Sequence, residues 1–81
     1  MTTNYTATIP HHANYIWDAL NRDNTVSTDT FAWVAEDLEK AETCADCYRF
    51  SEAVYWILCA ARQVFGAYSA KYAELVSFYS A

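Results

Sequence analysis

The feature that most constrains the fold is an unbroken run of nine apolar residues at positions 53–61, Ala-Val-Tyr-Trp-Ile-Leu-Cys-Ala-Ala. The run is flanked by Glu52 and Arg62 and is rich in helix-forming residues. It is too short to cross a bilayer, which takes about 20 apolar residues. A helix that is apolar on every side has to be covered by other elements. We therefore expect a buried central helix around residues 47–65.

The composition favours an all-α fold. Of the 81 residues, 54% are hydrophobic and 17% are aromatic, which is enough apolar surface to argue against a disordered chain. One glycine and one proline are too few for the turns of a small all-β domain. We expect one α-helical domain over residues 1–81, a compact bundle of three to four helices, with residues 1–8 as a flexible N-terminal arm.

Periodic apolar residues predict two helices before the central one. The first begins near Pro10, which suits a helix's first turn, and ends in a polar turn at residues 22–25. Ser27 or Thr28 caps the second. Thr43 and Asp46 resemble a capping box, so a break near residue 43 is an alternative. The two apolar stripes are Ala13, Ile16, Trp17 and Leu20, then Phe31, Val34, Leu38, Ala41 and Ala45.

A heptad-like seam runs from Val54 to Tyr79 and is interrupted by Gly66. Either Gly66 ends one helix and a C-terminal helix follows at residues 67–80, or one long helix runs through. We favour the break, because a compact domain needs another helix to cover the apolar run. The seam also leaves open a homodimer that buries it against a second copy.

The formal net charge of −5 is unevenly distributed. Residues 29–52 sum to −5, and the segments before and after them sum to −1 and +1. The five cationic side chains are scattered, whereas nucleic acids and anionic membranes require a basic surface. We therefore expect no direct binding to nucleic acid or membrane.

The N-terminal residues lack the basic start and apolar run of a secretory signal. Three cysteines are an odd number, so a complete intrachain disulfide framework is impossible. These features predict a reducing, cytoplasmic location, which is the host cytoplasm if a phage or plasmid carries the gene.

The candidate chemical groups do not combine into a catalytic site. Cys44-x-x-Cys47 matches half of a zinc site or a redox dithiol, with Cys59 or the His11–His12 pair as further ligands. Adjacent helical histidines point about 100° apart and do not jointly grip a ligand. We favour cysteines that pack between helices, and expect no metal, cofactor or enzymatic activity. A small zinc-binding domain using Cys44, Cys47 and Cys59 is the alternative.

Two surface features favour protein binding. Acidic side chains follow the outer face of the second helix, where solvation is the ordinary interpretation. The tyrosines are too many for one small core to satisfy every hydroxyl, and exposed tyrosines are typical of interfaces. The expected partner-binding residues are Glu36, Glu39, Glu42, Asp46, Tyr48, Tyr72 and Tyr79.

The sequence therefore predicts a small acidic, non-enzymatic module that binds a basic surface of another protein. The specific hypothesis is an inhibitor from a mobile element, of the anti-CRISPR or antirestriction type, that blocks a nucleic-acid-processing complex. A charge of −5 is modest for a DNA mimic, which favours local steric blocking. A homodimeric helical subunit with a structural role is the alternative.

Overall fold

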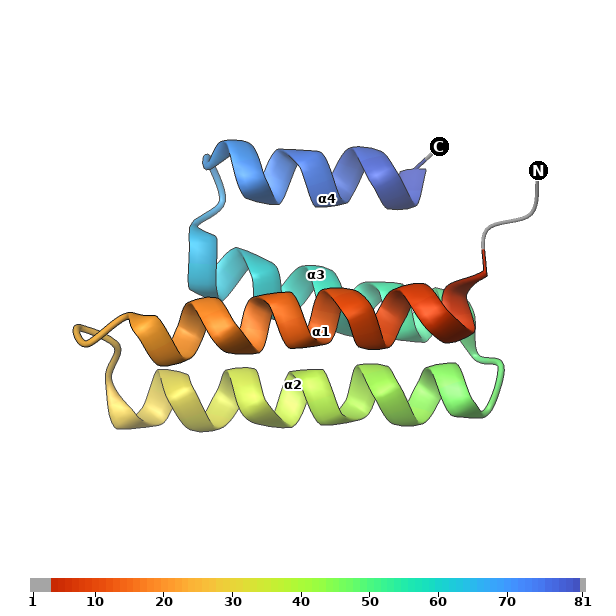
Figure 1. Cartoon of the computed structure of the whole chain (residues 1–81), viewed down its shortest axis with the longest axis horizontal. Coiled ribbons are helices and arrows are strands. Elements are labelled where there is room, and N and C mark those ends of the chain that lie inside the picture. Colours follow the sequence, from red (N-terminus) through yellow and green to blue (C-terminus); the bar gives the residue numbers. More distant parts are fainter. Residues whose placement is uncertain (1–3, 81) are drawn as a thin grey trace.

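The computed structural model describes residues 4–80, and within that range it consists of four α-helices and no strand (Figure 1). The prediction of an all-α bundle is confirmed. No helix between residues 4 and 80 has the length and apolar character needed to span a membrane. The helices are α1 (Tyr5–Arg22), α2 (Thr28–Asp46), α3 (Phe50–Phe65) and α4 (Ala70–Ser80).

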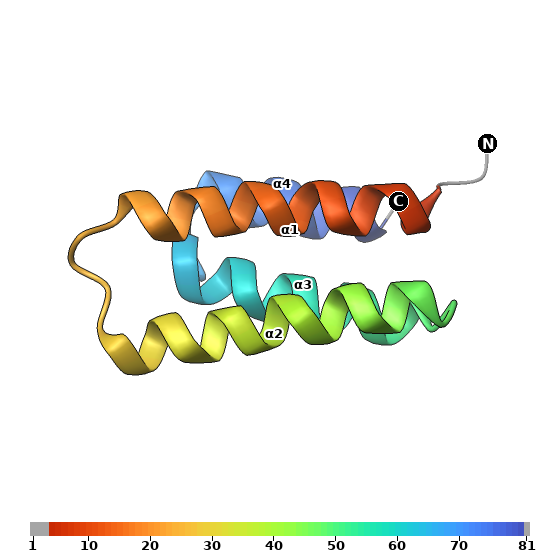
Figure 2. The same ribbon diagram turned by 60° about the horizontal axis from the view of Figure 1, so that its bottom comes forward.

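The central helix is α3, which contacts each of the other three helices. Figure 1 shows α2 and α4 on opposite sides of the pair formed by α1 and α3, and in the turned view of Figure 2 α4 lies behind α1. No Cα atom of α2 lies within 8 Å of a Cα atom of α4. The outer faces of these two helices therefore present separate surfaces.

The core follows the heptad-like spacing of the first two helices. Buried positions in α1 and α2 recur at intervals of four and three residues, which keeps one stripe of each helix against its neighbours. Five of the eight buried residues of α2 and α3 are alanines, so these two backbones can approach closely. The buried residues are Ile9, Ala13, Ile16, Leu20, Val34, Leu38, Ala41, Ala45, Ala53, Ile57, Ala60, Ala61 and Leu75.

The apolar run forms the middle of α3 but is not buried on every side. Ala53, Ile57, Ala60 and Ala61 are fully buried, whereas Tyr55 is 60% exposed. The ring of Tyr55 instead lies against the ring of Trp56, with the two centroids 5.0 Å apart. The expectation of a central helix is confirmed, and the expectation that its whole circumference is covered is wrong.

The turn between α2 and α3 sets the start of the central helix at Phe50, three residues later than predicted. Tyr48 adopts a left-handed conformation with φ of 59°. The N–H of Arg49 donates to the carbonyl oxygen of Cys44 at 2.8 Å, and the N–H of Tyr48 donates to that of Ala45 at 3.1 Å. This pair of bonds is a Schellman motif, which usually places glycine at the left-handed position. α2 runs through Thr43 without the break considered above.

The first helix begins at Tyr5, so residues 5–8 are helical and do not belong to a flexible arm. The side chain of Asn4 caps the helix by accepting a hydrogen bond from the N–H of Ala7 at 3.4 Å. Pro10 consequently lies in the second turn and not in the first. Residues 1–3 of the predicted arm lie outside the described residues.

Gly66 ends α3, as favoured from the sequence, with φ of 93°. The next helix begins at Ala70 and not at residue 67, because the hydroxyl of Ser69 caps it by accepting from the N–H of Tyr72 at 3.1 Å. Tyr68, which belongs to the predicted seam, lies fully exposed in this turn. The continuous seam on which the homodimer hypothesis depends is therefore broken.

Candidate protein-binding surface

The net charge of the protein resides in α2. This helix carries six acidic residues and one lysine, a net charge of −5, which equals the charge of the whole chain. The remaining residues carry four acidic and four basic side chains and sum to zero. Any electrostatic attraction between this protein and a partner therefore comes mainly from one helix.

Four acidic residues on the outer side of α2, here called the acidic ridge, are Glu36, Glu39, Glu42 and Asp46. Glu36, Glu39 and Asp46 are exposed, and Glu42 is half-buried. Glu36 pairs with Lys40 at 3.0 Å. Within residues 4–80, the other three carboxylates form no ion pair. Most of the ridge is thus available to a cation from outside.

The remaining carboxylate in this part of α2 has a structural contact. Asp37 is partly buried and accepts a hydrogen bond from Nε2 of Gln63 on α3 at 2.9 Å. Burial raises the pKa of Asp37, and the bond from Gln63 opposes that rise. Asp37 therefore ties α2 to α3 and is not part of the ridge.

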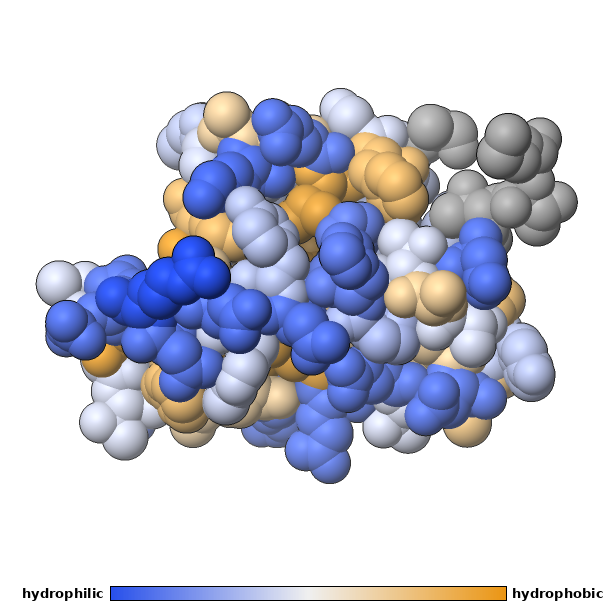
Figure 3. All heavy atoms as spheres, in the orientation of Figure 1, coloured by the Kyte–Doolittle hydropathy of each residue, from blue (hydrophilic) through white to orange (hydrophobic). Residues whose placement is uncertain are grey.

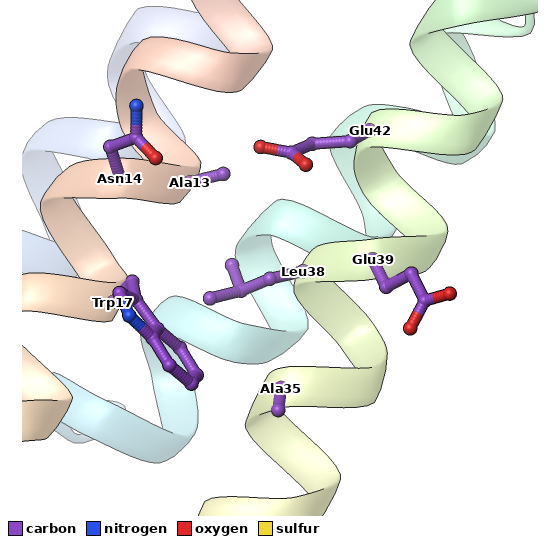
Figure 4. A pocket seen from close by; sticks show the side chains of 7 residues that line it. All are labelled: Ala13, Asn14, Trp17, Ala35, Leu38, Glu39 and Glu42. Atoms are coloured by element: carbon purple, nitrogen blue, oxygen red, sulfur yellow. The ribbon is translucent and has the colours of Figure 1, made fainter.

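A groove between α1 and α2, here called the α1–α2 groove, borders the ridge on one side (Figure 4). It encloses about 290 Å³. The carboxylate of Glu42 points across it toward α1, and the indole of Trp17 projects into it from α1, whereas the carboxylate of Glu39 points away. The lining residues are Ala13, Asn14, Trp17, Ala35, Leu38, Glu39 and Glu42, and none of them is cationic.

A second groove, here called the α2–α3 groove, borders the ridge on its other side. It encloses about 280 Å³ and is lined by Glu36, Glu39, Lys40, Thr43, Cys44 and Trp56. Nζ of Lys40 lies 4.5 Å from the ring centroid of Trp56, within the range of a cation–π contact. This groove already contains a cation of the protein itself. Each groove thus combines glutamate carboxylates with one indole ring, but only the α2–α3 groove contains a cationic side chain.

Tyr48 lies near the C-terminal end of the ridge and is 75% exposed. Its left-handed backbone costs about 1 kcal/mol or more in a residue that has a Cβ. The structure therefore holds a large aromatic side chain in solvent at a position that glycine would occupy with less strain. This is the predicted tyrosine that lies beside the acidic ridge.

The structure does not bring Tyr72 and Tyr79 to the acidic ridge. Both lie on α4, on the opposite side of the α1–α3 pair from α2, and both are partly buried. Figure 3 shows apolar side chains along the side of α4 that faces the rest of the bundle, with hydrophilic ones on its outer side. The structure therefore separates Tyr72 and Tyr79 from the other five expected partner-binding residues.

Tyr79 has a packing role. Its hydroxyl shares a 2.5 Å hydrogen bond with Nδ1 of His12, and its ring lies 5.7 Å from that of Tyr5. Burial raises the pKa of Tyr79 well above its ordinary value, with a smaller contribution from Tyr5. The hydroxyl is therefore satisfied inside the protein and is not presented to a partner.

Two tryptophans that the sequence did not assign to the site line its grooves. Trp17 falls in the apolar stripe of the first helix, yet the buried positions are 9, 13, 16 and 20, and Trp17 is 38% exposed. Trp56 sits inside the apolar run and is only partly buried. If the alternating spacing of four and three residues is applied strictly, position 17 falls on the flank of the first helix and not in its core stripe. This spacing is the sequence signal that could have identified Trp17 as a surface residue.

The cysteines and histidines do not assemble into a metal site. Cys44, Cys47 and Cys59 are free thiols, and in the stretch from Asn4 to Ser80 no three metal-ligating side chains lie close enough together to hold an ion. His12 faces α4, while His11 is exposed. Among residues 4–80, the zinc-binding alternative has no group of three candidate ligands.

Comparison with known protein families, with curated proteins and with solved structures finds no significant match to this chain. The role of the surface therefore has to be inferred from its own chemistry. Open grooves lined by carboxylates and indole rings are suited to binding cationic side chains.

Proposed function

We propose that this protein is a non-enzymatic binding module that docks the acidic ridge of α2 on a basic surface of another protein. One observation carries the proposal: the entire net charge lies on α2, and three of the four ridge carboxylates have no cationic partner within residues 4–80. Carboxylates arranged in this way attract a basic partner and fix the register of docking.

Aromatic side chains beside the ridge supply the apolar part of the interface. Trp17, Trp56 and Tyr48 flank the ridge and are all at least partly exposed. In protein interfaces, buried aromatic anchors contribute most of the affinity, while charged rims contribute more to association rate and specificity. The ridge and its flanking rings together provide both contributions.

The proposed partner is a protein whose basic surface binds nucleic acid, and the proposed consequence is inhibition. Proteins of the anti-CRISPR or antirestriction type, carried by mobile elements, act in this way inside the cytoplasm of the host. α2 has 19 residues and is therefore about 28 Å long. A DNA duplex of that length carries about 16 phosphate charges, against −5 for the helix. Local blocking of a basic site is the mode that this charge supports.

The test is affinity capture with the tagged protein from its native cell or host. The ridge variant Glu39→Lys/Asp46→Lys is compared with Asp18→Lys/Glu74→Lys, which makes the same change in net charge at exposed residues of α1 and α4. We expect the ridge variant to lose the partner and the control to retain it. Circular dichroism establishes that both variants are folded.

The salt dependence gives an independent result. If the ridge is the interface, raising the salt concentration from 0.15 M to 0.5 M should elute much of the partner, because exposed charges are then screened. Capture that is equal for both variants and insensitive to salt would show that the ridge does not bind the partner.

A further inference from the structure

The α1–α2 groove contains a carboxylate and an indole without a cation. Glu42 is half-buried and its carboxylate points across the groove, while Trp17 presents its ring from α1 (Figure 4). The floor between them includes Ala13, Ala35 and Leu38, which are apolar. Such a groove matches a side chain with an apolar stem and a cationic, hydrogen-bonding head.

The neighbouring α2–α3 groove shows the same combination with a cation in place. Lys40 lies over Trp56 at 4.5 Å and pairs with Glu36 at 3.0 Å. An indole and a carboxylate on this protein therefore accommodate a cationic side chain together. In the α1–α2 groove the corresponding pair, Trp17 and Glu42, has no such side chain within residues 4–80.

We infer that the α1–α2 groove is the site at which an arginine side chain of the partner binds. The inference rests on the proposed function and specifies its central contact. The guanidinium group is planar, so it can stack on the indole of Trp17 while donating hydrogen bonds to the carboxylate of Glu42. Its methylene stem covers the apolar floor. The ammonium group of lysine is not planar, so it cannot stack on a ring and donate a bidentate hydrogen bond at the same time.

Other occupants are disfavoured by charge. A second copy that placed its own α2 here would bring another helix with a net charge of −5 against the ridge. Nucleic acid and anionic membranes carry the same sign of charge and are repelled likewise. An exposed arginine on a basic protein satisfies both the charge and the shape of the groove.

The test uses two peptides that differ only in the cationic residue. One alternates arginine with glycine over nine residues, and the other has lysine in place of each arginine. Each is titrated at low salt into the ¹⁵N-labelled protein, whose three tryptophans give three separate indole N–H signals. Single Trp→Phe substitutions assign those signals. The matched variants are Glu42→Gln and Glu74→Gln, which remove the same charge from the groove and from an exposed position of α4 that lines neither groove.

We expect the arginine peptide to bind about fivefold more tightly than the lysine peptide and to shift the Trp17 indole signal more than those of Trp33 and Trp56. Glu42→Gln should abolish this preference, and Glu74→Gln should leave it intact. Equal affinity for the two peptides, or equal effects of the two variants, would overturn the arginine site. Salt-dependent binding of both peptides would in that case still support the acidic ridge as a cation-binding surface. Binding of neither peptide would overturn the groove and the proposed function together.

Discussion

Nδ1 of His12 lies 2.5 Å from the hydroxyl oxygen of Tyr79, and this hydrogen bond joins two residues that are 67 positions apart in the sequence. It connects the first helix to the last. The ring of His12 also meets the rings of Phe78 and Tyr79 edge-on, with centroids 5.1 and 5.4 Å apart. This contact lies on the side of the bundle that faces away from α2, so the aromatic residues of α4 that take part in it are separated from the acidic ridge.

Replacing Tyr79 with phenylalanine should lower the free energy of unfolding by about 0.5–1.5 kcal/mol, because a partly buried nitrogen of His12 loses its hydrogen-bond partner. Tyr72→Phe is the matched control, since no hydrogen bond of the Tyr72 hydroxyl is present among the described residues. Urea denaturation of both variants measures the difference. Equal losses would show that the bond between His12 and Tyr79 contributes nothing to stability.

The same contact predicts that the protein is destabilised in mild acid. Partial burial, and to a lesser extent the charge of His11, lower the pKa of His12 below its ordinary value of 6.5. The folded protein therefore favours neutral His12. The stability that this preference contributes is lost as the pH falls from about 6.5 through the lower pKa that His12 has in the folded state. The other titratable groups facing this site are Tyr5, His11, Tyr15, Lys71, Glu74 and Tyr79.

The measurement is the free energy of unfolding at pH 7.5 and pH 5.5. We expect His12→Gln to have a smaller decrease between these values than the unmodified chain. His11→Gln, at an exposed position, should retain most of the decrease. A wild-type decrease that survives unchanged in His12→Gln would assign the effect to another group.

Tyr48 provides a prediction about strain. Tyr48→Gly should raise the free energy of unfolding by about 0.5 kcal/mol, because relief of a left-handed backbone worth about 1–2 kcal/mol exceeds the entropy that glycine adds to the unfolded chain. Tyr48→Ala keeps the strain and loses the contact with Phe50, so it should not stabilise the protein. If Tyr48 belongs to the interface, Tyr48→Gly should also weaken partner capture. A loss of stability in Tyr48→Gly similar to that in Tyr48→Ala would contradict this account of the turn.

The central helix is tested by a pair of substitutions in α3. Ile57 is fully buried and Tyr55 is 60% exposed. Ile57→Ala should cost about 2–5 kcal/mol, a large part of the roughly 4–12 kcal/mol available to a chain of 81 residues. Tyr55→Ala should cost less than about 1 kcal/mol. Thermal denaturation of the two variants checks the order, and a reversed order would contradict the described packing.

The helices were predictable because their apolar residues recur with helical spacing. The predicted side of the second helix is Phe31, Val34, Leu38, Ala41 and Ala45. The last four are buried, whereas Phe31 is 36% exposed. The end of α2 was less predictable, since a Schellman motif is normally marked by glycine and here contains Tyr48. At the other end of the chain, Pro10 indicated the first turn of a helix, but Asn4 provides an earlier cap.

The candidate site was predictable only where it lies on one helix. Glu36, Glu39, Glu42 and Asp46 share a face of α2 because of their spacing, which the sequence displays directly. The contribution of Trp17 depends on which helix packs beside α2, and the exclusion of Tyr79 depends on how the turn at residues 66–69 directs α4. These relationships arise from tertiary packing, and the sequence marks Trp17 only as a flank position of its helix.

The central claim is that the acidic ridge of α2 contacts the partner, and the most direct test is the dissociation constant of the captured complex for Glu39→Lys/Asp46→Lys and for Asp18→Lys/Glu74→Lys. We predict at least a tenfold loss of affinity for the ridge variant and a change of less than about twofold for the control. Equal affinities for the two variants, with both proteins folded, would contradict the claim.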